Sequence, residues 1–433
     1  MNNLTDSISR TDRLVIAALL LLSLGLYFYG LGNNAVWTQN EGYYTDAVRT
    51  MLETGDWMDI RYNGEPRYQK PPLVYWLMAL SAALFGLKEW ALRLPIVLGS
   101  LGAVWLTYVL TALLSHRKTG LLAAFVMFFS FQFAINARYA TPDAPLTFFL
   151  LLTLYGWIRG LRERNRIWAW TGYLGLGLTL LMKGFPFLII LAAIFGLFLF
   201  WQHRGNWRNT LREVWWMQPL LGFPAAMGMG FSWLAYMYWT AGDAFHEVFM
   251  SETVNRAFTE EKPYRLSDLT FYWEANLWGF LPYSLVFYAT FLYLIFQKFK
   301  SVRQSPLLQL ALVWFGVWMA VFTVSKGKIP TYFMQAHPPM SMLAAWGILS
   351  IHPEKGWRNW LWEGAFWLPA VVFTIIGAGL VWAFGLPPWW YVLPLLPWPA
   401  LWIRSAWCGS RLLPYTTTLA AFVIFMTGVL PPI

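Results

Sequence analysis

The apolar run at residues 71–87, PPLVYWLMALSAALFGL, decides how the rest of the chain is arranged. A helix that crosses a bilayer needs about 20 predominantly apolar residues, and this run is shorter. If the run crosses, every later segment changes side. If it lies at the membrane surface, none does. The segments before and after it must therefore decide its role.

The composition is that of a polytopic membrane protein. Of the 433 residues, 58% are hydrophobic and 12% are charged, whereas an ordinary soluble protein has about 25% charged residues. Such a chain cannot cover several soluble domains with a polar surface. The single cysteine, Cys408, excludes a disulfide framework and a cysteine-rich metal site. The net charge of +10 comes from short basic clusters between apolar runs, which membrane topology explains without a nucleic-acid partner.

Apolar stretches of about 20 residues recur along the whole chain. We therefore predict an all-α polytopic membrane protein with about 13 transmembrane helices and amphipathic juxtamembrane helices in the first outer loop. The first stretch is expected to remain as an anchor, because no small-residue cleavage site precedes the polar segment after Gly32. The predicted spans are 14–32, 93–115, 119–137, 146–160, 167–182, 186–201, 212–239, 273–297, 306–324, 331–350, 361–384, 388–403 and 411–430.

The basic clusters favour a surface position for 71–87. If this run crosses, the clusters at 117–118, 159–166 and 204–212 face outward, against the positive-inside bias. If it does not, the inside segments hold 18 of the 31 Lys and Arg but only 6 of the 21 Asp and Glu, which leaves 13 and 15 outside. We therefore expect a multi-pass protein of the plasma membrane, a bacterial inner membrane, with a cytoplasmic N-terminus and an outer C-terminus.

The polar segments place function at the outer membrane interface. We expect one transmembrane domain over 1–433, a first outer loop at 33–92, a second large outer loop at 240–272, and no soluble domain after the last span. Within the first loop, residues 41–52 show apolar side chains at helical spacing and predict an amphipathic helix.

Charged residues at the ends of apolar spans are candidate site residues, because unpaired charge there is unfavourable. On the predicted outer side they collect in five short segments. Carboxylates beside lysines and arginines suit general-base chemistry next to an anionic group, with the cations stabilising a departing phosphate. The five segments are 40–49, Arg67 to Pro72, Arg138 to Asp143, Lys183-Gly184, and SKGKIPTY at 325–332.

The order of these motifs resembles the GT-C glycosyltransferases of the protein mannosyltransferase and aminoarabinose-transferase type. The first loop carries the resemblance in Asn40-Glu41 and in YQKPPL at 68–73, and the start of the next span carries it in Arg93-Leu94-Pro95. Arg138 to Asp143 is similar to the family's second acidic motif, Lys183-Gly184 to its lysine-glycine pair, and 325–332 to a late motif of the aminoarabinose branch. The resemblance covers roughly residues 14–350.

The resemblance implies an integral-membrane enzyme that takes a sugar from a polyprenyl-phosphate donor, such as an undecaprenyl-phosphate sugar, on the outer face. It implies transfer to a lipid, glycan or protein acceptor with inversion at the anomeric carbon, among membrane lipids. It also implies a carboxylate near the acceptor and basic groups around the donor phosphate. The catalytic candidates are Glu41, Asp143 and Asn40, and the substrate-binding candidates are Tyr44, Arg67, Tyr68, Lys70, Arg138, Tyr139, Lys183, Lys326, Lys328 and Tyr332.

Two positions depart from the family pattern. Asn40 stands where the family usually has Asp, and Gln69 stands where the aminoarabinose branch has Glu. An amide cannot act as a base and is a weaker ligand for a divalent cation than a carboxylate. A divalent metal is therefore not expected, and either Glu41 or Asp143 takes the carboxylate role.

Other interpretations of the same residues stay open. Glu41 can satisfy backbone donors, Asp143 can cap a helix, and the interfacial cations can bind ordinary lipid headgroups. At the level of function, the amides Asn40 and Gln69 favour a catalytically weakened relative that binds polyprenyl phosphate as a partner or scaffold. A flippase for lipid-linked sugars is a third alternative, although its paired broken helices are not visible in the sequence.

Overall fold

The computed structural model divides the chain into two compact units, one of residues 1–31 with 367–433 and one of residues 32–366. All helices and strands named below belong to the second unit. The structure describes residues 25, 27–33, 35–36, 38–251, 266–296, 299–325, 327–351, 364–365, 368, 371–372, 375–376, 378–379 and 382.

The first predicted amphipathic helix is confirmed as α2 (Gln39–Thr54). Thr38 caps its N-terminus, because the side-chain oxygen accepts from the Glu41 N–H at 3.1 Å. Gly55 ends the helix with φ of 75°, a left-handed conformation that glycine adopts without a steric penalty. The buried face of the helix consists of Glu41, Tyr44, Ala47, Val48 and Met51.

A small hairpin follows α2 that the sequence did not predict. Strands β1 (Arg61–Tyr62) and β2 (Glu65–Pro66) pair antiparallel around Asn63-Gly64. Both turn residues have positive φ, 49° and 81°, as a two-residue hairpin turn requires. The fold is otherwise helical in the part of the chain that the structure describes.

The decisive apolar run forms α3 (Leu73–Phe85), which has 13 residues. At 1.5 Å per residue such a helix is about 20 Å long, shorter than the ~30 Å hydrocarbon core. Its length fits the prediction that the run does not cross, while its side of the membrane stays a prediction. One face of α3 packs against α4 (Glu89–Leu114) and α2, and Leu80 and Leu84 on the other face are more than half exposed.

The centre of the unit is the helix pair α7 (Asp143–Glu163) and α8 (Arg166–Lys183). Glycines allow the two backbones to approach closely, since a Cβ added to Gly156 would lie 2.4 Å from the Gly172 nitrogen. The two helices run in opposite directions because only a short turn at Arg164 and Asn165 joins them. The first residue of α7 and the last residue of α8 consequently lie at the same end.

Several predicted spans are broken in the structure. Residues 119–137 divide into α5 (Arg117–Phe128) and α6 (Phe131–Asn136), and the expected span 331–350 begins as the 3-10 helix η2 (Pro330–Ala336). Only then does α18 (His337–Ser350) start, with prolines in the first turn, where a missing N–H leaves no helical bond unmade.

The expected span 212–239 is also corrected. It contains the end of α10 (Trp207–Trp216) and then α11 (Pro219–Gly230) and α12 (Ser232–Phe249), which meet at a bend of 46°. The helix α12 extends to residue 249 with a kink at Gly242, so the start of the expected outer loop 240–272 belongs to this kinked helix instead. Loop residues 252–265 lie outside the described residues.

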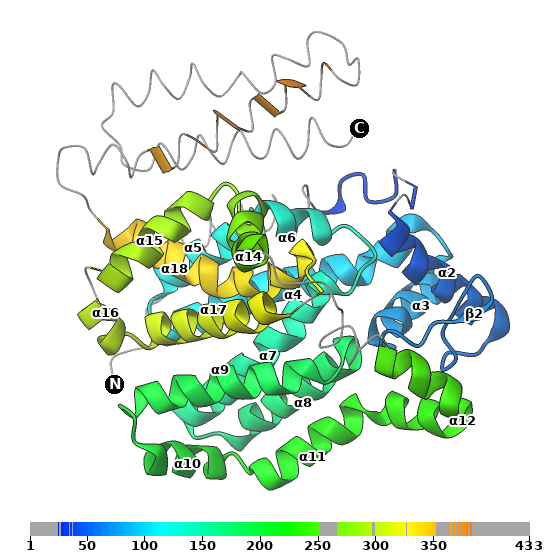
Figure 1. Ribbon diagram of the computed structural model, residues 1–433, viewed down its shortest axis with the longest axis horizontal. Coiled ribbons are helices and arrows are strands. Elements are labelled where there is room, and N and C mark those ends of the chain that lie inside the picture. The colour runs from blue at the N-terminus through cyan, green and yellow to red at the C-terminus, as the bar shows by residue number, and fades with distance from the viewer. Residues whose placement is uncertain are drawn as a thin grey trace. The chain divides into compact units, whose positions relative to one another are not determined.

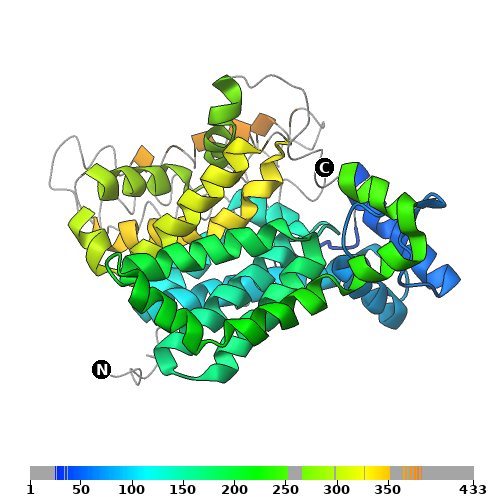
Figure 2. The same ribbon diagram turned by 60° about the horizontal axis from the view of Figure 1, so that its bottom comes forward.

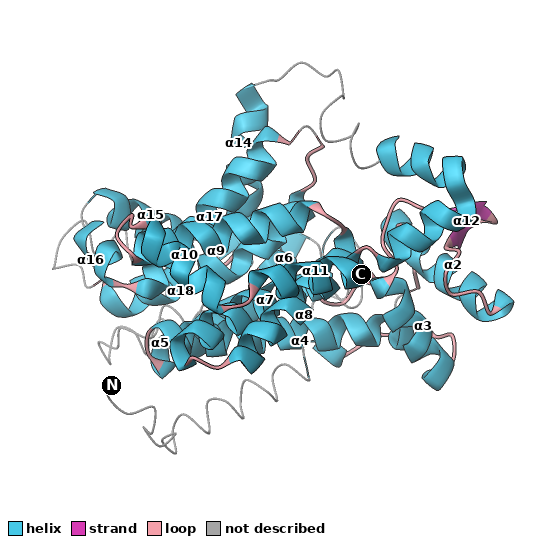
Figure 3. Ribbon diagram, turned by 90° about the horizontal axis from the view of Figure 1, so that it is seen from below, coloured by secondary structure: helices cyan, strands magenta, loops and turns pink. Residues whose placement is uncertain are grey.

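The remaining helices complete the unit. Their bounds are α9 (Pro186–Gln202), α14 (Leu266–Gly279), α15 (Ser284–Phe296), α16 (Phe299–Gln304) and α17 (Pro306–Val324). Helix α17 packs against α9 and α18. Figures 1 and 2 show that α2, α3 and α12 gather at one end of the helices, and Figure 3 shows the hairpin there, beside α12 and α2.

The number of transmembrane helices is not fixed at thirteen by this structure. Among the described residues, α4, α7 and α17 are long and apolar enough to cross a membrane, and the bent pair α11–α12 is a fourth possibility. The shorter apolar helices are α3, α9 and α15. Most of the predicted span 14–32 and of the three spans after residue 360 lies outside the described residues.

We predict that Gly156→Ala destabilises the α7–α8 pair. A methyl group there meets the backbone of α8, so one helix must move, and overpacking of this kind lowers the free energy of unfolding by about 1–3 kcal/mol. Gly196→Ala in α9 is the matched control, because its Cβ would meet no atom within 4 Å. Thermal unfolding of both variants in detergent is the measurement, and equal melting temperatures would contradict the packing argument.

Candidate active site

Glu41 makes a fully buried ion pair that holds the first loop against the helices. Its carboxylate accepts from Arg93 Nε at 2.7 Å and from Arg93 Nη2 at 2.9 Å, and also from the Ala140 N–H at 2.9 Å. Glu41 is 0% exposed and Arg93 4%. The interaction joins α2, α4 and the turn before α7. A carboxylate held by three donors and closed to solvent is suited to positioning these segments.

A second ion pair lies where α7 begins and α8 ends. The Lys183 ammonium donates to Asp143 Oδ1, and the two side chains are only 11% and 7% exposed. Gln335 of η2 donates to the Asp143 backbone oxygen at 3.0 Å, and Lys183 Nζ lies 4.7 Å from the centre of the Tyr332 ring. The late motif thus lies directly against the Asp143–Lys183 pair.

Aromatic residues of the first loop enclose a third cation, Arg67. Its guanidinium carbon lies 4.1 Å from the centre of the Tyr43 ring, a cation–π distance, and its Nε donates to the Tyr75 hydroxyl at 3.2 Å. The rings of Tyr44 and Tyr75 are 5.0 Å apart. Arg67 is therefore fixed beside the buried face of α2.

Tyr44 connects this aromatic group to the second ion pair. Burial raises the pKa of its hydroxyl well above the usual value, and the nearby Tyr75 and Asp143 raise the pKa further while Arg67 opposes them. Tyr44 therefore stays protonated and can donate a hydrogen bond. Because these groups act on one hydroxyl, Asp143 and Arg67 belong to the same region.

The segment before α3 lies against the end of α8. Gly184 follows Lys183 with φ of 98°, and a Cβ built on it would be 4.0 Å from Pro71 Cγ. Lys70 directly precedes Pro71 in the chain and is half-buried. Tyr68 is buried and packs against Phe245 of α12, with ring centres 5.5 Å apart. The motif 67–71 is thereby held between α12 and the α8–α9 corner.

Other candidates are farther from this cluster or have structural partners. Arg138 lies near Arg93, and burial together with that neighbouring charge lowers the pKa of Arg138. Tyr139 is half-buried in the same turn. Lys328 donates to the Thr323 and Ser325 carbonyls at 2.6 and 2.8 Å and so caps α17, while Lys326 lies outside the described residues.

Asn40 and the adjacent Glu41 differ in their exposure to solvent. Asn40 is exposed, whereas Glu41 is fully buried, because adjacent helical residues point in different directions. Among the described residues, no group of three His, Cys, Asp or Glu is placed to hold a metal ion. The nearby donors also fit a divalent cation poorly, since Asp143 is paired with Lys183 and Asn40 is an amide.

Arg93, Tyr75 and Gln335 were not selected from the sequence as site residues. Arg93 carried a usable signal, because a charge at the start of an apolar span requires a partner. Gln335 carried none, since its contact with Asp143 joins residues 192 apart in the chain.

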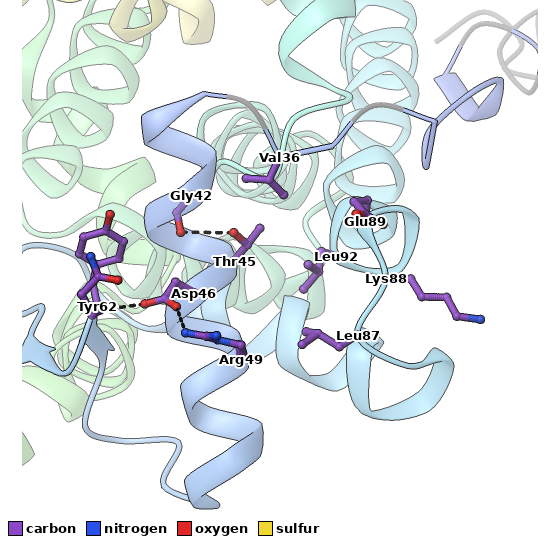
Figure 4. A pocket seen from close by; sticks show the side chains of 11 residues that line it. Val36, Gly42, Thr45, Asp46, Arg49, Tyr62, Leu87, Lys88, Glu89 and Leu92 are labelled. Carbon is purple, nitrogen blue, oxygen red and sulfur yellow. Dashed lines mark hydrogen bonds and ion pairs between the residues drawn. The ribbon is translucent and has the colours of Figure 1, made fainter.

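A separate hollow of about 400 Å³ lies on the opposite face of α2. Figure 4 shows Asp46 and Arg49 pointing toward each other there, while Lys88 extends away from α2. Asp46 also accepts from the Asn63 N–H at 2.8 Å, which fixes the hairpin on α2. The hollow is distinct from the cluster around Asp143.

We predict that Glu41→Gln lowers the free energy of unfolding by about 3–5 kcal/mol, because it leaves the Arg93 guanidinium buried without a counter-charge. The control is Arg49→Met, which breaks an ion pair on the same helix whose arginine is 52% exposed, and we expect less than about 1 kcal/mol there. Denaturation of both variants in detergent measures the difference. Similar losses of unfolding free energy in both variants would show that the buried Glu41–Arg93 pair stabilises the fold no more than the exposed pair does.

Comparisons with known proteins agree with the motifs. Residues 69–239 match the dolichyl-phosphate-mannose-protein mannosyltransferase family. An uncharacterized protein of Aquifex aeolicus is 34% identical over 322 residues, 74% of this chain and 61% of that protein. The undecaprenyl phosphate-alpha-4-amino-4-deoxy-L-arabinose arabinosyl transferase of Shewanella sediminis is 25% identical over 343 residues, 77% of this chain and 60% of that enzyme. The chain thus spans about three-fifths of the length of these relatives.

The fold has a solved counterpart. The crystal structure of ArnT from Cupriavidus metallidurans bound to undecaprenyl phosphate superposes with a TM-score of 0.79 at 18% identity, covering 98% of this chain and 77% of that one. Together, the family match and this fold confirm the resemblance predicted from the sequence motifs.

Proposed function

Because this chain has the fold and the sequence signature of the GT-C glycosyltransferases of the protein mannosyltransferase and aminoarabinose-transferase type, we propose that it is an integral-membrane glycosyltransferase. The donor is a sugar on a polyprenyl phosphate such as undecaprenyl phosphate. The acceptor is a lipid, glycan or protein group on the outer face. The observation that carries the proposal is the buried Asp143–Lys183 pair beside Tyr332, Tyr44 and the Arg67 motif.

The proposed reaction is a displacement at the anomeric carbon. An acceptor oxygen forms the new bond from one face while the bond to the phosphate oxygen breaks on the other, so the configuration inverts. The bonding electrons leave with the polyprenyl phosphate, and the acceptor proton passes to a carboxylate. Cations near the phosphate stabilise its growing charge, and they act more strongly in a site shielded from water.

Asp143 is the carboxylate that fits the role of base. Glu41 is saturated by Arg93 and the Ala140 N–H, and Asn40 cannot accept a proton at its amide. Among the described residues, Lys183 is the cation paired with Asp143 Oδ1, and Asp143 retains slight solvent exposure. Glu41 then serves as a positioning residue.

Lys183 links donor binding to this base. A donor phosphate near Lys183 competes with Asp143 for the ammonium, which weakens the ion pair and makes the carboxylate a better proton acceptor. Lys70 and Arg67 are carried on the segment that lies against Gly184, so they can share the same phosphate. Arg138 and Lys326 remain additional candidates for that role.

We predict that Asp143→Asn lowers the turnover number by about 10²–10⁴-fold, because an amide cannot take the acceptor proton. Binding of undecaprenyl phosphate should be retained or become tighter, since a neutral amide competes less than the carboxylate for Lys183. Transfer of labelled sugar into lipid, glycan and protein fractions measures turnover and also identifies the acceptor class. Full activity of this variant would remove Asp143 from the chemistry.

We predict that Lys183→Ala weakens phosphate binding and lowers transfer by about 10²–10³-fold, because it removes a cation placed at the leaving group. Lys300→Ala is the matched control, since Lys300 is exposed on α16. Unchanged transfer in Lys183→Ala would remove the phosphate role of this lysine.

The exposed amide of Asn40 favours one other candidate function, namely binding of polyprenyl phosphate as a scaffold without sugar transfer. The variant Asn40→Asp separates the two functions. If the present chain is inactive and this variant transfers sugar, the scaffold function is supported. Equal sugar transfer by the unaltered chain and by Asn40→Asp supports the glycosyltransferase function.

A further inference from the structure

Gln69 has a buried amide oxygen that accepts no hydrogen bond. Buried side-chain polar atoms nearly always have a partner, because an unmade hydrogen bond in the interior is unfavourable. Such an atom in a native structure marks a position that a water molecule, an ion or a ligand can complete. The Gln69 oxygen is therefore open to a hydrogen-bond donor from a bound molecule.

The backbone on both sides of Gln69 is fixed. The preceding Tyr68 is anchored on Phe245, and two residues later Pro71 lies against Gly184, the neighbour of Lys183. Two residues span at most about 7 Å. Gln69 is consequently held beside the end of α8 from which Lys183 reaches Asp143.

The surrounding charge is unfavourable for a cationic ligand. Arg67 and Lys70 lie within two residues of Gln69 in the sequence, and Lys183 lies close by. Two carboxylates of this region already pair with cations, Asp143 with Lys183 and Asp59 with Arg61. An ammonium group placed here would meet like charges and a neutral amide.

A hydroxyl group fits this position better. The Gln69 amide offers one acceptor and two donors without net charge, and a sugar hydroxyl both donates and accepts. A site built to hydrogen-bond one such group discriminates strongly against an analogue that cannot reproduce the pairing.

We propose that Gln69 contacts the donor sugar and selects an uncharged, hydroxylated sugar over an amino sugar. This inference rests on the proposed transferase function and assigns its substrate class. It also distinguishes this chain from the relatives named for a 4-amino-4-deoxy-L-arabinose donor.

Binding of two matched donors tests the proposal. Undecaprenyl phosphate-linked L-arabinose and its 4-amino-4-deoxy analogue differ only in one hydroxyl or amino group, and undecaprenyl phosphate alone serves as the reference. The full chain in lipid nanodiscs should bind the hydroxyl donor about tenfold more tightly than the amino donor. This ratio corresponds to a difference in binding free energy of about 1.4 kcal/mol. The isosteric Gln69→Glu should reverse that ratio, because its carboxylate pairs with the ammonium.

Two further variants make the outcome decisive. Gln69→Leu should reduce the preference for the hydroxyl donor to the part that the surrounding cations impose. Gln304→Glu, at an exposed position of α16, should keep the original ratio although it adds the same charge as Gln69→Glu. The proposal is overturned if Gln69→Glu leaves the ratio unchanged, if the unaltered chain prefers the amino donor, or if neither sugar affects binding beyond undecaprenyl phosphate. Transfer assayed in parallel keeps the questions separate, because a shifted binding ratio without transfer contradicts only the catalytic function.

Discussion

The buried contact between Glu41 and Arg93 is the constraint on which the rest of the site depends. Two charges removed from water are tolerated only when their geometry is good and their remaining hydrogen bonds are made. The bidentate contact and the Ala140 N–H meet that condition. The interaction fixes the rotation of α2 about its own axis. That rotation directs Tyr44 inward toward Asp143 and leaves Asp46 and Arg49 on the far face.

The packing of α7 against α8 provides the second fixed element. Small residues bring the two backbones together, and the chain direction then places Asp143 and Lys183 at one end without any contribution from loops. A site on helix ends is more rigid than one on connecting segments. Helix η2 adds Tyr332 and Gln335 to this end and α2 adds Tyr44, so with Asp143 and Lys183 themselves four separate parts of the sequence meet at the ion pair.

The sequence predicts the helical class, the amphipathic α2 and the motifs of the site, because periodicity and charge placement are local signals. It does not predict where spans break, since neither glycine nor proline marks the break between α5 and α6, and the apolar pattern of 331–350 does not separate η2 from α18. The role of Glu41 was equally hidden. A carboxylate next to Asn40 in a catalytic motif has the same sequence pattern whether it faces a substrate or Arg93. The partner lies 52 residues away, and only the fold brings the two together.

The contacts that hold the first loop also impose an order on biosynthesis. Glu41 can make its ion pair only after Arg93 has been synthesised, 52 residues later, and its contact with the Ala140 N–H only 99 residues later. The Met58 carbonyl accepts from Trp233 Nε1 at 2.9 Å, across 175 residues. A chain emerging from the ribosome therefore delivers its first loop long before the partners exist. The loop cannot make all of its contacts until α12 has been synthesised, so the site is completed late although its first residues are translated early.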